Sequence, residues 1–138
     1  MTYNLHFEGS VSDAMHTCLP QYSGVYLVYR GRFDAKDNLF YCMEILYIGQ
    51  AENIRNRIMN HERRQDFLQE CRRGETIFYS YAQCQNSILN MVENAYIYVM
   101  KPRLNTIGVD SYKYITPIQI ISDGACALLN TNFEIQSS

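Results

Sequence analysis

The stretch GVYLVYR at residues 24–30 and the stretch FYCMEILYIG at residues 40–49 decide the fold of this chain. Both are rich in β-branched and aromatic side chains and are bounded by turn-forming residues, which is typical of β-strands. They are close enough in sequence to form an antiparallel hairpin. A turn centred on residues 36–37 would place Tyr26 directly opposite Tyr47, with both phenols on one face of the sheet.

The remaining pattern predicts helices and further strands around this hairpin. The expected elements are helices over 51–61 and 63–73, a strand over 75–82, a helix from an N-cap at Asn86 to a stop at Pro102, and strands over 112–121 and 125–135. The expected fold class is α/β, of the α+β kind: a small mixed or antiparallel central sheet flanked by helices, with an extended hairpin.

Length and charge limit the kind of protein this can be. The chain has 138 residues, 47% of them apolar, which is enough for one compact domain spanning 1–138. Its net charge of −2 argues against a protein that coats nucleic acid over its whole surface. Six arginines and four acids lie within residues 50–73, so this segment carries +2 and the rest of the chain −4. We expect any phosphate-binding face there, although a solvated helix surface explains each single arginine equally well.

The cysteines and the hydropathy pattern predict a cytoplasmic protein with no membrane association. Five cysteines form an odd set without a CxxC pair, which fits neither a disulfide framework nor a zinc finger, and we expect buried thiols in a reducing compartment. The N-terminus has no signal-peptide pattern, and no apolar run approaches the roughly 20 residues of a membrane helix.

Three polar residues follow the hairpin at helical spacing. Asn53, Arg57 and His61 are four residues apart, so a continuous helix would present them along one side. A guanidinium there can bind a phosphate through two hydrogen bonds. The alternatives are a salt bridge between Arg57 and a nearby acid and, for His61, a hydrogen-bonded histidine without a catalytic role.

Glu93 and Asn105 are candidates on the following helix and just beyond it. Glu93 lies at the border of the apolar stripe of its helix, where a carboxylate can bind a hard cation together with water and substrate phosphate. An ion pair with an arginine is the competing interpretation. Asn105, taken alone, is an ordinary loop asparagine. Gly24 and Gly49, beside the two tyrosine motifs, indicate places where backbone or ligand approaches closely.

Together these residues resemble the GIY-YIG nuclease family. Its first motif corresponds to Gly24-Val25-Tyr26 and its second to Tyr47-Ile48-Gly49, while the helix with the catalytic arginine and nearby histidine resembles residues 50–61. Glu93 corresponds to the metal-binding glutamate, and the segment 101–105 is similar to the terminal asparagine motif. The likeness covers about residues 22–105, leaves a C-terminal extension over 106–138, and is greatest to small stand-alone bacterial members. Five elements in the right order are more specific than any one of them.

The resemblance implies a metal-dependent DNA endonuclease that hydrolyses phosphodiester bonds with Mg²⁺ or Mn²⁺ held by Glu93. A tyrosine would assist the attacking water, and the substrate would be duplex, nicked or branched DNA; homodimerisation is possible. The implied catalytic residues are Tyr26, Tyr47, Arg57, His61, Glu93 and Asn105. The implied DNA-binding residues are Gly49, Gln50, Asn53, Arg55, Arg57, Arg63 and Arg64.

Three departures from the family pattern and two alternative functions accompany this expectation. Twenty residues separate the two tyrosine motifs, more than is usual. Gln50 stands where a number of relatives carry lysine or a hydroxyl, and the chain has no evident second DNA-binding domain. The first alternative is a module that kept the fold but lost turnover and binds DNA or a protein partner. The second is a protein-interaction domain unrelated to nucleic acid, which the negative charge favours.

Overall fold

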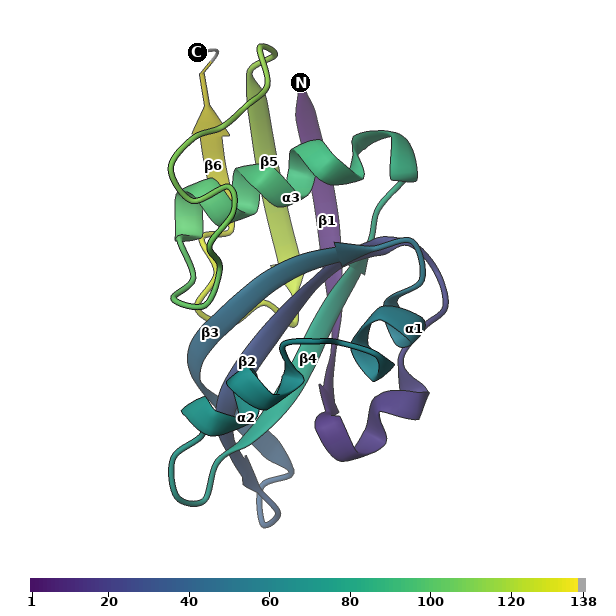
Figure 1. Cartoon of the computed structure of the whole chain (residues 1–138), viewed down its shortest axis with the longest axis vertical. Coiled ribbons are helices and arrows are strands. Elements are labelled where there is room, and N and C mark those ends of the chain that lie inside the picture. The colour runs from purple at the N-terminus through teal and green to yellow at the C-terminus, as the bar shows by residue number, and fades with distance from the viewer. Residues whose placement is uncertain (137–138) are drawn as a thin grey trace.

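The computed structural model describes residues 1–136 and shows a curled mixed sheet with helices packed against it (Figure 1). Within these residues the strands are hydrogen-bonded in the order β3-β2-β4-β1-β5-β6. In chain order the elements are β1 (Thr2–Ser12), the 3-10 helix η1 (Asp13–Cys18), β2 (Gly24–Asp34), β3 (Leu39–Ala51), α1 (Ile54–Met59), α2 (Arg64–Glu70), β4 (Thr76–Gln83), α3 (Asn86–Met100), β5 (Ile118–Gly124) and β6 (Asn132–Ile135). The predicted combination of a mixed sheet with flanking helices is confirmed.

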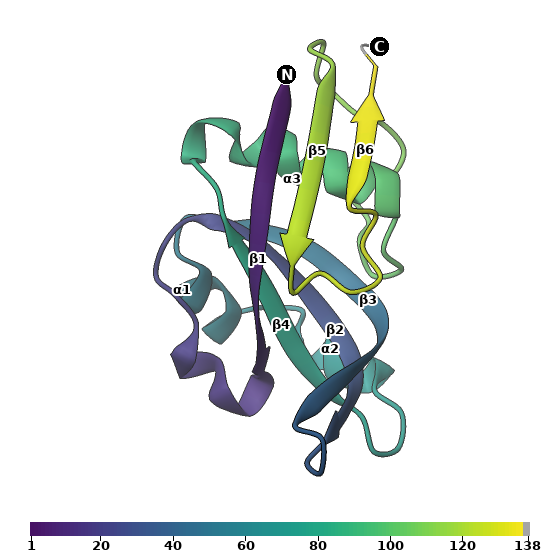
Figure 2. The ribbon, with the colours of Figure 1, turned by 180° about the vertical axis from the view of Figure 1, so that it is seen from behind.

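Both ends of the chain contribute to this sheet. β1 was not predicted, because only Leu5 and Phe7 of its residues are buried and the apolar pattern is weak. It pairs antiparallel with β4 and parallel with β5, so the segment expected as a C-terminal extension, 106–138, supplies two strands of the sheet. Seen from behind, β1, β5 and β6 lie side by side with α3 on their far side (Figure 2).

The predicted register of the hairpin is wrong by two residues. Near its tip, Asp34 pairs with Leu39, the register expected from the turn, but β3 contains two irregularities, and Tyr26 consequently pairs with Gly49 and Tyr47 with Val28. Because a shift of one residue reverses the faces, two shifts restore them. The two phenols therefore remain on the same face, as diagonal rather than direct neighbours.

Two apolar cores lie on opposite faces of the central strands. Alternate residues of β2 point either way: Val25, Leu27 and Tyr29 pack with α3, whereas Tyr26 and Val28 pack towards α1 and α2. Because successive side chains of β2 enter one core and then the other, the strand is apolar along nearly its whole length. The second core brings the first tyrosine motif next to the short helices that carry the polar candidates.

The predicted helices exist but differ at their ends. The expected helix 51–61 is only Ile54–Met59, and the expected helix 63–73 is only Arg64–Glu70. The N-cap of α3 is Gln85, without a side-chain cap, rather than Asn86. Its end is as expected, since Pro102 follows Lys101, whose positive φ of 46° closes the helix.

The strands expected over 112–121 and 125–135 are shorter and displaced. β5 begins at Ile118 and continues through residues 122–124, where a turn was expected. Asn94 on α3 explains the late start, because its amide binds the backbone of Ser111 and Lys113 and holds that segment against the helix. Among residues 1–136 no helix is long and apolar enough to cross a membrane. The cysteines are free thiols, but Cys18 is exposed, so the expectation that all five are buried is wrong.

Candidate active site

Tyr26, Tyr47 and His61 form an aromatic cluster where β2 and β3 meet the α1–α2 connection. Tyr26 is fully buried, and its ring centroid lies 6.4 Å from that of Tyr47 with the planes 29° apart. The imidazole of His61 stands edge-on to both rings, at centroid distances of 5.9 Å and 5.5 Å. Gly49 makes room for this arrangement, since a Cβ there would lie 2.3 Å from the phenol carbon and oxygen of Tyr26. The close approach inferred at Gly49 is thus made by Tyr26; at Gly24 it is made by the backbone of Ala82.

The hydrogen bonds of His61 define which nitrogen carries its proton. The Nδ1 atom accepts from the backbone N–H of Arg63 at 3.1 Å, so in the neutral ring the proton is on Nε2. Nε2 lies 2.8 Å from the Tyr26 hydroxyl and donates to its oxygen. His61 therefore acts as a donor towards Tyr26, which favours negative charge on the phenol oxygen. The position of His61 differs from expectation, because it lies beyond the end of α1 instead of on that helix.

Burial shifts the pKa values of the cluster in opposite directions. It lowers the pKa of His61 to about 4, and the charge of Arg57 acts in the same sense, so the imidazole is neutral at pH 7. Burial raises the pKa of Tyr26 far above its ordinary value, Tyr47 adds to the rise, and Arg57 opposes it. The pKa of Tyr47 is also raised, first by burial and then by the charge of Glu93. Both shifts oppose ionisation of the phenols at neutral pH, whereas the positive charge of Arg57 favours it.

The neutral state of His61 makes a testable contribution to stability. A folded-state pKa of about 4 lies below the ordinary value of about 6.5. The unfolded chain therefore takes up the proton first as the pH falls, and the stability present above pH ~6.5 decreases towards pH ~4 by roughly 2–3 kcal/mol. Thermal unfolding at pH 5 and pH 7.5 should show a smaller difference for His61→Gln than for the unsubstituted chain. Equal differences in the two proteins would contradict a buried neutral His61.

Arg57 is held by a neighbouring acid in this structure. Its two terminal nitrogens bind both carboxylate oxygens of Glu62, at 2.6 Å and 3.0 Å. This hydrogen bond lowers the pKa of Glu62 to about 2. The salt bridge considered as the alternative from the sequence is therefore present, and Glu62, which follows His61 directly, is its unrecognised partner. The Glu62 side chain is 66% exposed, so an ion pair at this place contributes little to stability and can be exchanged for another anion.

Glu93 lies on α3 beside a depression of about 200 Å³ lined by Tyr47, Arg63, Ile97, Asn105, Thr106 and Ile107. Burial raises its pKa, and a hydrogen bond from Gln50 opposes the rise. The Gln50 amide nitrogen is 3.4 Å from one Glu93 oxygen and also donates to Asn90. The ion pair with an arginine that was considered for Glu93 is not among the salt bridges formed by residues 1–136.

The donor set at Glu93 fits a hard divalent cation. A carboxylate oxygen is the ligand that Mg²⁺ prefers, and Mg²⁺ usually keeps several waters and binds substrate phosphate. Within residues 1–136, no three His, Cys, Asp or Glu side chains converge to form a metal site made by the protein alone. A cation bound at Glu93 would therefore have one ligand from this set and take its others from water and substrate, and the role of Glu93 as a metal ligand stays a prediction.

Asn105 fastens the loop after α3 to the open edge of the sheet. Its side-chain oxygen accepts from the backbone N–H of Ile48 at 2.9 Å, and its amide nitrogen donates to the Ile48 carbonyl at 3.0 Å. Since β3 is an edge strand, Asn105 satisfies backbone groups that no neighbouring strand can reach. These hydrogen bonds describe a residue that positions the loop.

Removal of this clamp should destabilise the fold. Asn105→Ala leaves both backbone groups of Ile48 unpaired in a buried place and should lower the free energy of unfolding by about 2–3 kcal/mol. Urea denaturation measures this loss. Asn60→Ala is the matched control, because the Asn60 side chain makes one exposed hydrogen bond to Asn56, so its loss should cost about 0.5 kcal/mol. Equal losses in the free energy of unfolding of the two variants would contradict a stabilising role for the Asn105–Ile48 hydrogen bonds.

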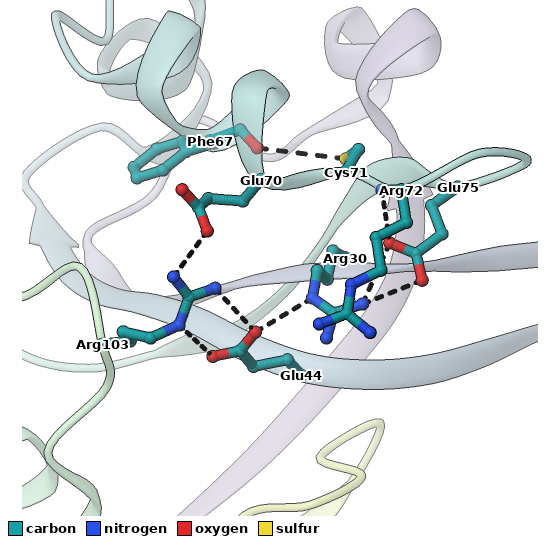
Figure 3. A network of polar contacts seen from close by, with 8 residues as sticks. All are labelled: Arg30, Glu44, Phe67, Glu70, Cys71, Arg72, Glu75 and Arg103. Carbon is teal, nitrogen blue, oxygen red and sulfur yellow. Dashed lines mark hydrogen bonds and ion pairs between the residues drawn. The ribbon is translucent and has the colours of Figure 1, made fainter.

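A network of ion pairs also holds this loop, through Arg103, as Figure 3 shows. Arg103 and the buried Arg30 both bind Glu44 on β3, each through its Nε atom at 2.9 Å. Arg30 also binds Glu75, and Arg103 binds Glu70 at the end of α2. Hydrogen bonding from Arg103, and then from Arg30, lowers the pKa of Glu44 below its ordinary value. The loop that carries Asn105 is thereby fixed to both β3 and α2.

The other predicted DNA contacts have partners within the chain. Asn53 is the N-cap of α1, accepting from the Asn56 N–H at 3.0 Å. Arg55 donates to the Leu19 carbonyl, Arg63 binds Asp66 and the Leu104 carbonyl, and Arg64 binds the buried Asp13. These contacts connect α1 and α2 to their surroundings. Three of the six arginines in the segment 50–73, namely Arg57, Arg63 and Arg64, are therefore held in ion pairs within the chain.

Comparison with known proteins adds no assignment: no family model, no curated protein and no solved structure gives a significant match to this chain. The functional argument rests on the residues themselves. The structure brings Tyr47, His61 and Arg57 around the phenol of Tyr26. Glu93 and Asn105 line the same depression as Tyr47.

Proposed function

We propose that the chain is a metal-dependent DNA endonuclease of the GIY-YIG kind. The observation that carries the proposal is the convergence of Tyr26, Tyr47, His61 and Arg57, with Glu93 beside the same depression as Tyr47. The six residues that the family resemblance singles out are far apart in sequence. An ion-paired arginine, a neutral histidine and a half-buried carboxylate next to paired phenols form an arrangement suited to acid–base chemistry on a phosphate.

Each residue has its own role in the proposed hydrolysis. One phenol, Tyr26 or Tyr47, first loses its proton to solvent. A water oxygen then attacks phosphorus and gives its proton to that phenolate, while the bond to the 3′ oxygen breaks and this oxygen takes a proton from solvent. Tyr47 lines the depression, whereas Tyr26 is enclosed by Gly49 and His61, so Tyr47 is the phenol open to water in this state. The His61 Nε2–H stabilises the Tyr26 oxygen, and Arg57 neutralises charge on the phosphate. Mg²⁺ or Mn²⁺ bound to Glu93 would supply the positive charge that stabilises the leaving oxygen.

Analysis of product ends tests the reaction type. A labelled oligonucleotide duplex incubated with the chain and Mg²⁺ should yield fragments with 5′ phosphate and 3′ hydroxyl ends, and none when EDTA replaces the metal. Products with 3′ phosphate ends would contradict the proposed direction of attack, and cleavage in EDTA would contradict the role of the metal.

One observation favours the alternative of a partner-binding module. Leu39, Tyr41 and Met43 alternate along the outer part of β3 and are 44–53% exposed, so the extended hairpin presents an apolar stripe suited to a protein partner. In that case the hairpin variant Tyr41→Ser would lose the partner without altering DNA affinity. The same stripe is compatible with a homodimer, which stays a prediction.

A further inference from the structure

A second depression adjoins the one beside Tyr47. It has a volume of about 180 Å³, and the two share Glu93, Ile97 and Ile107. Ile107 is 77% exposed, an unusual state for an isoleucine at the border of two hollows. None of the residues found only in the second depression has a role in the hydrolysis described above.

The wall of this second depression is fixed in place by Asn94, a buried residue of α3. Its amide nitrogen donates to the carbonyls of Gly108 and Ser111, at 3.3 Å and 3.1 Å, and its oxygen accepts from the Lys113 N–H at 2.9 Å. The side chain of Lys101 also binds the Val109 carbonyl. Three hydrogen bonds from one buried side chain hold residues 108–113 against the helix, so the hollow exists before any ligand arrives.

Apart from the shared Glu93 carboxylate, the lining combines an aromatic ring, aliphatic walls and a positive charge. Tyr114 is half-buried and packs against Tyr112, with the ring centroids 5.6 Å apart, while Ile97 and Ile107 supply aliphatic surface. Lys113 is exposed, and no ion pair formed within residues 1–136 involves it, in contrast to Arg57, Arg63 and Arg64. A flat apolar group bearing a negative charge is the ligand that such a surface accepts.

We propose that this second depression binds one unpaired nucleotide of the DNA strand, adjacent to the phosphodiester held at Glu93. The base lies against Tyr114 and the aliphatic walls, and Lys113 contacts its phosphate. A base inside a duplex is stacked and paired and cannot enter a hollow of this kind, so the preferred substrate has an unpaired nucleotide next to the cleaved bond. This inference rests on the proposed function, because it names the DNA structure that the same site selects.

A fluorescence titration tests the subsite without requiring cleavage. The probe is a DNA duplex with one unpaired 2-aminopurine nucleotide, titrated in EDTA beside the same duplex with that base paired. We expect the unpaired probe to bind at least tenfold more tightly and to be quenched on binding. Tyr114→Leu should lose about tenfold in affinity for it, and Tyr114→Phe, which keeps the ring, should retain the affinity. Lys113→Ala should reduce the slope of log affinity against log salt by about one.

The matched controls are Tyr41→Leu, a tyrosine of the hairpin outside the hollow, and Lys36→Ala at the hairpin turn; neither should change binding. Equal affinity for paired and unpaired probes, or full affinity in a folded Tyr114→Leu variant, would overturn the subsite. DNA cleavage together with such a result would leave the endonuclease proposal standing. A selective, Tyr114-dependent affinity in a chain that cleaves no DNA would keep the subsite and reject the endonuclease.

Discussion

Glu93→Gln should reduce DNA cleavage by about 10³-fold while making the folded chain slightly more stable. The substitution keeps the size and hydrogen-bonding capacity of the side chain but removes the anionic oxygen that would bind the cation, which is worth several kcal/mol in the transition state. Stability changes in the other direction because burial raises the pKa of Glu93. A carboxyl with a raised pKa stabilises the fold least at high pH, where it must be charged, and a neutral amide avoids that cost.

Measuring cleavage and thermal stability together distinguishes loss of the active site from unfolding of the chain. Initial cleavage rates and melting temperatures at pH 7.5 should move in opposite directions for Glu93→Gln. Glu134→Gln, an exposed carboxyl on β6 far from α3 in sequence, is the control and should change neither quantity. Full activity in Glu93→Gln, or a lower melting temperature accompanying the loss, would contradict the assignment of Glu93 as a half-buried metal ligand.

Arg57→Ala should also reduce cleavage strongly. It removes the guanidinium that neutralises the phosphate in the proposed mechanism and that lowers the cost of charge on Tyr26. We expect a loss of at least 10²-fold. Arg57→Lys should recover only part of it, since an ammonium group cannot form the two parallel hydrogen bonds of a guanidinium. Single-turnover rates on one oligonucleotide compare the three proteins, and a fully active Arg57→Ala chain would refute the role.

The ion pair with Glu62 supplies an informative control for Arg57. In the proposed mechanism a substrate phosphate replaces Glu62 on the guanidinium, so Glu62→Gln should keep activity and bind DNA more tightly than the unsubstituted chain. Asp66→Asn is the matched variant and should change DNA affinity less, because Arg63 keeps its hydrogen bond to the Leu104 carbonyl when the ion pair with Asp66 is lost. If Glu62→Gln lowers activity as much as Arg57→Ala does, the Glu62 carboxylate is itself required for catalysis. That result would contradict the replacement of Glu62 by a substrate phosphate on Arg57.

The features that depend on local sequence were predicted well. The hairpin, β4, α3 and its end before Pro102 follow from strand patterning and helix stop signals, and the shared face of Tyr26 and Tyr47 survived a wrong register. The exact pairing could not be predicted, because the two irregularities of β3 leave no signal in an apolar stretch. The parallel pairing of β1 with β5 joins residues more than a hundred positions apart, which no local pattern specifies.

For the candidate site, the sequence indicated the residues but not the arrangement of all of them. Spacing alone put Asn53, Arg57 and His61 on one helix, but α1 ends at Met59, and the Arg63 N–H fixes His61 beyond it. The arginines of 50–73 were expected to face phosphate, yet their acidic partners include Asp13, which is remote in sequence. The pairs Arg57–Glu62 and Arg63–Asp66 were the ones that the sequence could suggest, since their members are only five and three residues apart. Lys113 and Tyr114 gave no signal, because only the fold brings them beside Glu93.

Nicking of supercoiled plasmid by the purified chain tests the proposed function most directly, with Mg²⁺ or Mn²⁺ in one series, EDTA in a second, and Glu93→Gln in a third. We predict conversion to the open circular form with either metal in the unsubstituted chain, and none in EDTA or in Glu93→Gln. An intact plasmid in every series, with DNA binding retained, would contradict the endonuclease and favour a DNA-binding module with the same fold.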